Sequence, residues 1–125
     1  MILVDTSIWI DHFRSADESL VGLLSANRVL MHSFVIGELA CGNLRRRDEV
    51  LSLLKNLPAA TIGHDDEVRL FIEHRKLMGR GIGYIDAHLL TAVALSNGAR
   101  LWTRDKRLQG VASELGMAYA PPPQV

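Results

Sequence analysis

Three large apolar residues open the chain and run directly into an acid, and this stretch most constrains the fold. Residues 2–4 are Ile-Leu-Val, Asp5 follows them, and Thr6 and Ser7 come next. An apolar run without polar alternation is typical of a strand buried on both faces of a parallel sheet. Thr6 and Ser7 are residue types that cap helices, so we expect a helix to begin at Ile8. Asp5 should therefore lie at the carboxyl end of a central strand, where open α/β sheets bind ligands.

Short apolar runs and helical periodicity alternate through the rest of the chain. We predict strands at 2–4, 29–31, 60–62, 100–103 and 117–119, and helices at 8–14, 18–26, 34–42, 46–56, about 65–78, 85–96 and 106–115. This alternation predicts a single α/β domain with a mostly parallel sheet of about five strands and helices on both faces. The three prolines at 121–123 oppose regular structure, so we expect a domain over residues 1–120 and a loose tail over 121–125.

Composition narrows the class of protein. The chain has 125 residues, is 48% hydrophobic and has a net charge of zero, which suits one domain with a substantial core. The single cysteine, Cys41, excludes an internal disulfide and a cysteine-based zinc cage, and it fits a reducing cytosol. We see no apolar run long enough to cross a membrane and no leader, so we expect a cytoplasmic protein.

Four acids stand at the ends of predicted elements, within apolar surroundings. They are Asp5, Glu38, Asp86 and Asp105, whereas the other ten acids lie among polar neighbours. Four carboxylates that converge in one site repel strongly unless some are protonated or a hard cation neutralises them. Oxygen ligands select Mg²⁺ or Mn²⁺ rather than zinc. The hydroxyls of Ser7 and Thr103, each two positions from an acid, could then orient the acids or the waters on the metal.

Each acid also has an ordinary interpretation. Asp5 and Asp105 could be simple helix N-caps, and a glutamate such as Glu38 is common in helices. Asp86 is harder to dismiss, because it precedes an almost wholly apolar helix and needs a partner there. The joint placement of all four favours a shared site.

The segments that carry these acids resemble the ordered motifs of a known family. Residues 4–10 (VDTSIWI), 36–39 (IGEL), 85–87 (IDA) and 101–105 (LWTRD) resemble those of PIN-domain ribonucleases. The similarity is closest to the VapC toxins of bacterial toxin–antitoxin pairs. It extends from residue 1 to about residue 119, and its specificity comes from four motifs in the right order.

The resemblance implies a metal-dependent endoribonuclease toxin in which the four acids are catalytic. Asp5 and Asp86 would be the core Mg²⁺ ligands, and Ser7 and Thr103 the supporting hydroxyls. One or two ions held by the aspartates would activate water for in-line attack on an RNA phosphodiester, while Glu38 places a second ion or accepts a proton. The resemblance also implies a homodimer and a cognate VapB-like antitoxin whose tail covers the site.

Basic residues near the expected site are candidate RNA contacts. They are Arg45, Arg46, Arg104 and Lys106, and a solvated helix surface is the ordinary interpretation of each. The alternative function is a module that binds RNA or an antitoxin through the same acidic pocket without cleaving. A phosphoacceptor receiver-like domain fits less well, because Asp5 lacks a second adjacent acid. Transfer, ribosomal and messenger RNA are all compatible with the sequence.

Overall fold

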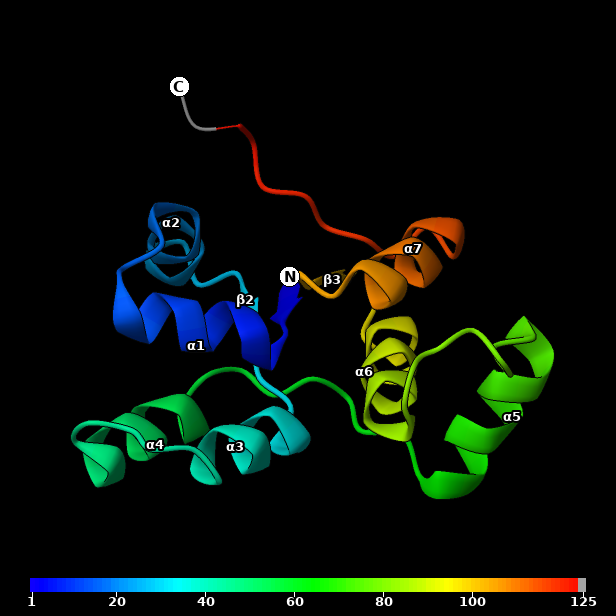
Figure 1. Ribbon diagram of the computed structural model, residues 1–125, viewed down its shortest axis with the longest axis horizontal. Coiled ribbons are helices and arrows are strands. Elements are labelled where there is room, and N and C mark those ends of the chain that lie inside the picture. The colour runs from blue at the N-terminus through cyan, green and yellow to red at the C-terminus, as the bar shows by residue number, and fades with distance from the viewer. Residues whose placement is uncertain (124–125) are drawn as a thin grey trace.

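The computed structural model describes residues 1–123, which form seven helices and three strands. In chain order they are β1 (Ile2–Val4), α1 (Thr6–Arg14), α2 (Glu18–Ser25), β2 (Val29–Leu30), α3 (Ser33–Ala40), α4 (Arg47–Lys55), α5 (Asp65–Arg75), α6 (Tyr84–Leu95), β3 (Arg100–Trp102) and α7 (Lys106–Glu114). All seven predicted helices are present in the described part of the chain. Figure 1 shows the short strands between two groups of helices, α1 to α4 on one side and α5 to α7 on the other.

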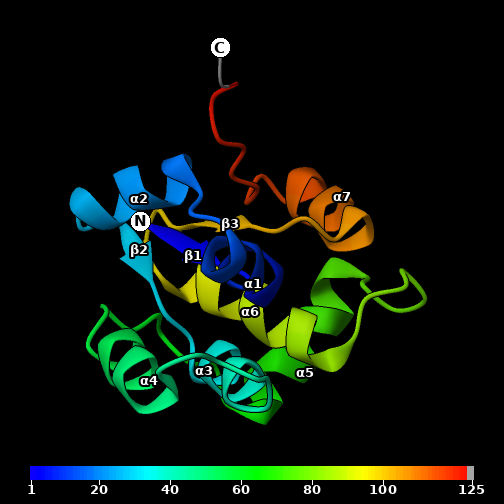
Figure 2. The ribbon, with the colours of Figure 1, turned by 60° about the vertical axis from the view of Figure 1, so that its left-hand side comes forward.

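The sheet is parallel and has β1 at its centre, in the order β2-β1-β3. Leu3 pairs with Leu30 of β2 and with Leu101 of β3, and Val4 pairs with Trp102. Every residue of β1 is buried, because strands lie on both of its edges and helices cover it. The prediction that the opening run forms the central strand is therefore confirmed (Figure 2).

The prediction of about five strands is wrong, since the described residues form three. The predicted strand at 60–62 is reduced to one bridge, between Met31 and Ala59. Pairing ends there because the next free amide, that of Thr61, donates instead to the hydroxyl of Ser96 at 2.9 Å. The segment thus lies along the outer edge of β2 without extending the sheet.

The predicted strand at 117–119 is also a single bridge, between Leu101 and Ala118. The Leu101 amide donates to Met117 and the Tyr119 amide donates to Leu101, at 2.7 and 2.8 Å. Two residues later the prolines at 121–123 begin, and a proline has no amide hydrogen with which to continue a ladder. Residues 124–125, the end of the predicted tail, lie outside the described residues.

Helix α6 runs through the core and fixes where one of the acids can lie. Its residues from Ala87 to Val93 are all buried, and it packs against β3 and α5. Trp9 and Trp102 are also buried, as expected of core residues. Within residues 1–123 we find no helix with the length and apolar character that crossing a bilayer requires. Asp86 stands at the point where α6 enters the core.

Two buried histidines lie between α3 and α6. His32 is the N-cap of α3, and its Nδ1 accepts the Phe34 amide at 3.0 Å. The His32 and His88 rings lie 6.4 Å apart. Burial, with a smaller contribution from the charge of His88, lowers the pKa of His32 from 6.5 to about 4. The fold therefore holds His32 in its neutral form at neutral pH.

This lowered pKa predicts a loss of stability in acid. The unfolded chain binds a proton at His32 near pH 6.5 and the folded chain near pH 4, so stability is lost as pH falls through this window. The contribution is roughly 3 kcal/mol at the acid end. His32→Asn keeps a helix-capping side chain but cannot titrate, so urea unfolding between pH 7 and pH 4 should show a flatter dependence. The exposed His74→Asn is the control, and an unchanged slope in His32→Asn would contradict the assignment.

Candidate active site

Asp5 is the buried centre of the candidate site. Its side chain is 8% exposed and forms the N-cap of α1. Oδ1 accepts the Thr6 amide at 2.8 Å, and Oδ2 accepts the Thr103 hydroxyl at 2.7 Å. The carboxylate is therefore fixed from two sides, by the start of α1 and by the end of β3.

Two threonine hydroxyls connect Asp5 to two further acids. The Thr6 hydroxyl donates to Oε1 of Glu38 on α3 at 2.7 Å. The Thr103 hydroxyl, which donates to Asp5, also accepts the Asp105 amide at 3.1 Å. The result is a continuous hydrogen-bonded run that joins α3, α1, the end of β3 and the start of α7. We call it the carboxylate–threonine chain: Glu38, Thr6, Asp5, Thr103 and Asp105.

The aspartates lie at the N-termini of three helices. Asp5 caps α1, Asp105 caps α7 through the Leu108 amide at 3.0 Å, and Asp86 in the first turn of α6 accepts the Gly83 amide at 3.1 Å. Helix N-termini carry partial positive charge, which favours carboxylates there. The helix-capping interpretation is thus correct for Asp5 and Asp105, and it is compatible with a shared site.

Asp86 lies close enough to the other three acids for their charges to act on it. Burial is the main cause that raises the pKa of Asp86 above its ordinary value, and the Gly83 hydrogen bond opposes it. The negative charges of Asp5, Asp105 and Glu38 raise this pKa further. The structure therefore brings together the four acids that the sequence singles out.

Thr6 is the contact that sequence reasoning missed. Helix α1 begins at Thr6, two residues before the predicted start. Successive residues of a helix are turned by about 100°, so Thr6 and Ser7 face different neighbours. Thr6 reaches Glu38, whereas the buried Ser7 hydroxyl has no hydrogen-bond partner among the described residues. In the sequence, only the position of Thr6 directly after Asp5 could have indicated that Thr6 connects Asp5 to Glu38.

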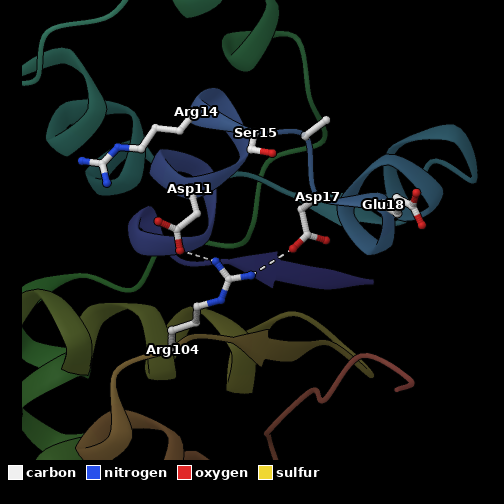
Figure 3. Close-up of a pocket in the computed structure, with 7 residues that line it drawn as sticks. Asp11, Arg14, Ser15, Asp17, Glu18 and Arg104 are labelled. Atoms are coloured by element: carbon white, nitrogen blue, oxygen red, sulfur yellow. Dashed lines mark hydrogen bonds and ion pairs between the residues drawn. The ribbon is translucent and has the colours of Figure 1, made fainter. Parts of the chain in front are cut away.

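The four candidate RNA-binding cations differ in their surroundings. Arg104 is held by Asp11 and Asp17, and Figure 3 shows its guanidinium between the two carboxylates. Arg46 lies 4.0 Å from Glu49, on the exposed start of α4. Arg45 and Lys106 are exposed, and among the described residues neither forms an ion pair. Lys106 directly follows Asp105, which makes it the cation beside the site.

The donor set fits a hard, hydrated cation. Within residues 1–123 no three carboxylate, imidazole or thiolate side chains stand close enough to ligate one ion as they lie. Mg²⁺ keeps several of its waters and needs only one or two direct carboxylates. Burial is the main cause of the raised pKa of Asp86, and the charges of Asp5, Asp105 and Glu38 add a smaller part that such a cation would offset. All candidate ligands are oxygens, which is the ligand type that Mg²⁺ and Mn²⁺ prefer.

Comparison with known proteins agrees with this geometry. A model of the PIN domain matches residues 2–114. Two curated relatives named Ribonuclease VapC32, from two strains of Mycobacterium tuberculosis, are each 52% identical over 120 residues, which is 96% of this chain and 97% of theirs. The crystal structure of FitAcB from Neisseria gonorrhoeae shares the fold, with a TM-score of 0.62 at 18% identity over 90% of this chain and 94% of that one. The predicted resemblance is confirmed, and the chain belongs to the PIN-domain family and, within it, to the VapC group.

Proposed function

We propose that this protein is a metal-dependent endoribonuclease whose catalytic residues are Asp5, Glu38, Asp86 and Asp105. The observation that carries the proposal is the carboxylate–threonine chain, which meets Asp86 at the ends of three helices. The charges of the other three acids make ionisation of Asp86 less favourable, and a bound cation would offset that cost. The ribonuclease name of relatives that are 52% identical supports RNA as the substrate.

Each acid has a distinct duty in this proposal. Asp5, Asp86 and Asp105 hold Mg²⁺, which when bound lowers the pKa of water and stabilises charge on a phosphoryl oxygen. The Thr103 hydroxyl keeps Asp5 from rotating. Glu38 is exposed, and its Oε1 takes the Thr6 hydroxyl, so Oε2 is available to accept a proton from the attacking water.

The backbone of the RNA needs positive charge beside the acids. Three helix N-termini supply part of it, because their free amides favour phosphate. Lys106, next to Asp105, supplies a full charge, and Arg45 and Arg46 are more distant candidates on the loop after α3. Ser7 keeps its proposed supporting role through a hydroxyl that no described residue engages.

Membership of the VapC group supports three further parts of the proposal. A VapB-like antitoxin binds the protein and inhibits it, the protein forms a homodimer, and it acts in the cytoplasm. Co-expression of an antitoxin candidate with this chain, followed by RNA cleavage with and without that candidate, tests the inhibition. Size-exclusion chromatography with light scattering tests the dimer.

The test of the activity is direct. The purified protein is incubated with single-stranded RNA in Mg²⁺, in Mn²⁺ and in EDTA. We expect discrete fragments with either metal and intact RNA with EDTA. RNA that stays intact in both metals, while gel shifts show that it is bound, would favour the non-cleaving alternative over the proposed activity.

A further inference from the structure

We infer that Arg104 is a positioning residue, which clamps the turn carrying Thr103 and Asp105 to α1 and α2 and thereby sets the geometry of the carboxylate–threonine chain. The inference rests on the proposed ribonuclease function for its kinetic consequences, and on the contacts of Arg104 for its physical basis. It assigns to this arginine a role other than the RNA contact that the sequence suggests.

Two carboxylates from different elements hold the guanidinium. Nη1 pairs with Oδ2 of Asp11 on α1, and Nη2 donates to Oδ2 of Asp17 at 2.9 Å (Figure 3). These contacts span 93 and 87 residues of sequence. An arginine whose two N–H groups bind two acids from different elements has less rotational freedom than one with a single partner, because each charge-assisted bond restrains the other.

Asp17 is a rigid anchor for this clamp. Its side chain is 19% exposed, and its other oxygen, Oδ1, caps α2 by accepting the Leu20 amide at 3.1 Å. Its own amide donates to Nδ1 of His12 at 3.0 Å. Both oxygens of Asp17 are thus used, one for the start of α2 and one for Arg104.

The position of Arg104 in the chain gives the clamp its consequence. Arg104 lies between Thr103, whose hydroxyl fixes Asp5, and Asp105, whose amide donates to that same hydroxyl. Because β3 ends at Trp102, no strand ladder restrains this turn. The side chain of Arg104 ties the turn to α1, the helix that Asp5 caps. The ion pairs of Arg104 therefore fix the turn that carries Thr103 relative to the start of α1 that carries Asp5, and so fix the hydrogen bond between these two residues.

The surroundings of Arg104 disfavour an RNA phosphate. A pocket of about 490 Å³ lies beside the guanidinium, and three acids line it together with two arginines: Asp11, Asp17 and Glu18 with Arg14 and Arg104. A phosphate placed there would face more negative than positive charge. Arg107 differs from Arg104 in this respect. Its guanidinium packs on Gly81, and among the described residues no acid forms an ion pair with it.

Kinetics distinguish a clamp from a substrate contact. In Mg²⁺, Arg104→Met should lower kcat on the order of 10- to 100-fold with little change in KM, because a misplaced catalytic geometry slows the chemical step. Arg104→Lys, which keeps one charged contact, should recover part of kcat. Arg69→Met removes an arginine paired with Asp66 within α5 and should leave both constants unchanged. A raised KM with unchanged kcat in Arg104→Met would overturn the inference.

The substitution Asp11→Asn distinguishes a clamp from an RNA contact, because the two roles predict different changes in kcat and KM. If Arg104 is a clamp, loss of one anchor lowers kcat, and adding Arg104→Met to Asp11→Asn costs less than it does alone. If Arg104 binds RNA, releasing it from Asp11 lowers KM and steepens the salt dependence of binding. A lowered KM with unchanged kcat in Asp11→Asn would therefore contradict the clamp.

A readout without metal or RNA keeps the inference independent of the proposed activity. The Asp105 amide is bonded to Thr103 Oγ1, so its hydrogen exchange reports the turn directly. In Arg104→Met and Asp11→Asn we expect exchange at Asp105 at least about tenfold faster, with exchange in β1 unchanged. Unchanged exchange at Asp105 would overturn the clamp whether or not the protein cleaves RNA. Should Arg104→Met fail to fold, Arg104→Lys and Asp11→Asn decide the same question.

Discussion

Asp5→Asn is expected to abolish RNA cleavage while leaving the fold in place. The asparagine Oδ1 can still accept the Thr6 amide and cap α1, since asparagine is among the best N-cap residues. Thr103 can turn its hydroxyl and accept from the new amide group, but its own hydroxyl hydrogen then loses the acceptor that Asp5 provides, which is a loss of one hydrogen bond, about 1 kcal/mol. Apart from this one bond, the substitution removes only the negative charge. We expect kcat/KM to fall on the order of a thousandfold or more, because a metal site is worth several kcal/mol of charge stabilisation.

The matched control for Asp5→Asn is Asp48→Asn. Asp48 lies in the first turn of α4, is exposed, and takes no part in the carboxylate–threonine chain. The Asp48→Asn variant should cleave RNA at the wild-type rate. Circular dichroism should agree for all three proteins, and the free energy of unfolding of Asp5→Asn should fall by no more than one hydrogen bond, about 1 kcal/mol. Cleavage by folded Asp5→Asn within tenfold of wild type would remove Asp5 from the catalytic set, whatever the other acids do.

Most of the element order could be predicted because each helix carries its own signals. Helix α6, for example, begins after a glycine-rich segment and ends at Leu95, shortly before Asn97-Gly98, as its composition indicates. The errors fall on the two outermost strands. Apolar runs at 60–62 and 117–119 have strand composition, but pairing depends on which neighbour offers an acceptor, and the Ser96 hydroxyl takes the Thr61 amide. Which acceptor an amide reaches depends on the tertiary structure, so the local sequence pattern does not show it.

Two of the four acids could be found because buried apolar segments flank them, whereas Glu38 and Asp105 are exposed and are indicated by their place in the ordered motifs. Asp5 follows an apolar strand and Asp86 precedes an apolar helix, and charges are rarely placed there without a function. Their partners could not be found in the same way. The choice of Thr6 over Ser7 depends on where α1 begins, to within one residue. The engagement of Arg104 depends on contacts about ninety positions away in sequence.

Capping and catalysis are not competing explanations of these aspartates. The bonds to the Thr6, Gly83 and Leu108 amides orient the carboxylates of Asp5, Asp86 and Asp105 before any ligand arrives. An acid that caps a helix is held in one rotamer, and a metal site requires ligands fixed in that way. The helix termini thus offset part of the repulsion among the acids and keep them in place.

Asp86→Asn is expected to have opposite effects on activity and on stability without metal. Burial and three neighbouring acids raise the pKa of Asp86, so its ionised form is less favourable in the folded chain than in the unfolded one. Such a group stabilises the fold at low pH, and this stabilisation is lost as pH rises above the ordinary value of 3.8. Asparagine cannot ionise, so it avoids the cost of a charged Asp86 in the folded chain, and its side-chain oxygen can still accept the Gly83 amide. The thermal midpoint of Asp86→Asn in EDTA at pH 7 should therefore be higher than that of the wild type.

In Mg²⁺ the difference in thermal midpoint between Asp86→Asn and the wild type should become smaller or change sign. A cation that binds only the folded state stabilises it by RT ln(1 + c/Kd), where c is the concentration of free Mg²⁺, and the wild-type site has one more carboxylate with which to lower Kd. The wild-type midpoint should therefore rise with added Mg²⁺ more than that of Asp86→Asn, while cleavage by the variant falls on the order of a thousandfold. Asp66→Asn, on the exposed start of α5, should follow the wild type in every respect. If Asp86→Asn is less stable in EDTA and gains as much from Mg²⁺ as the wild type, Asp86 acts only as the first-turn acid of α6, and the metal site lies elsewhere among the acids.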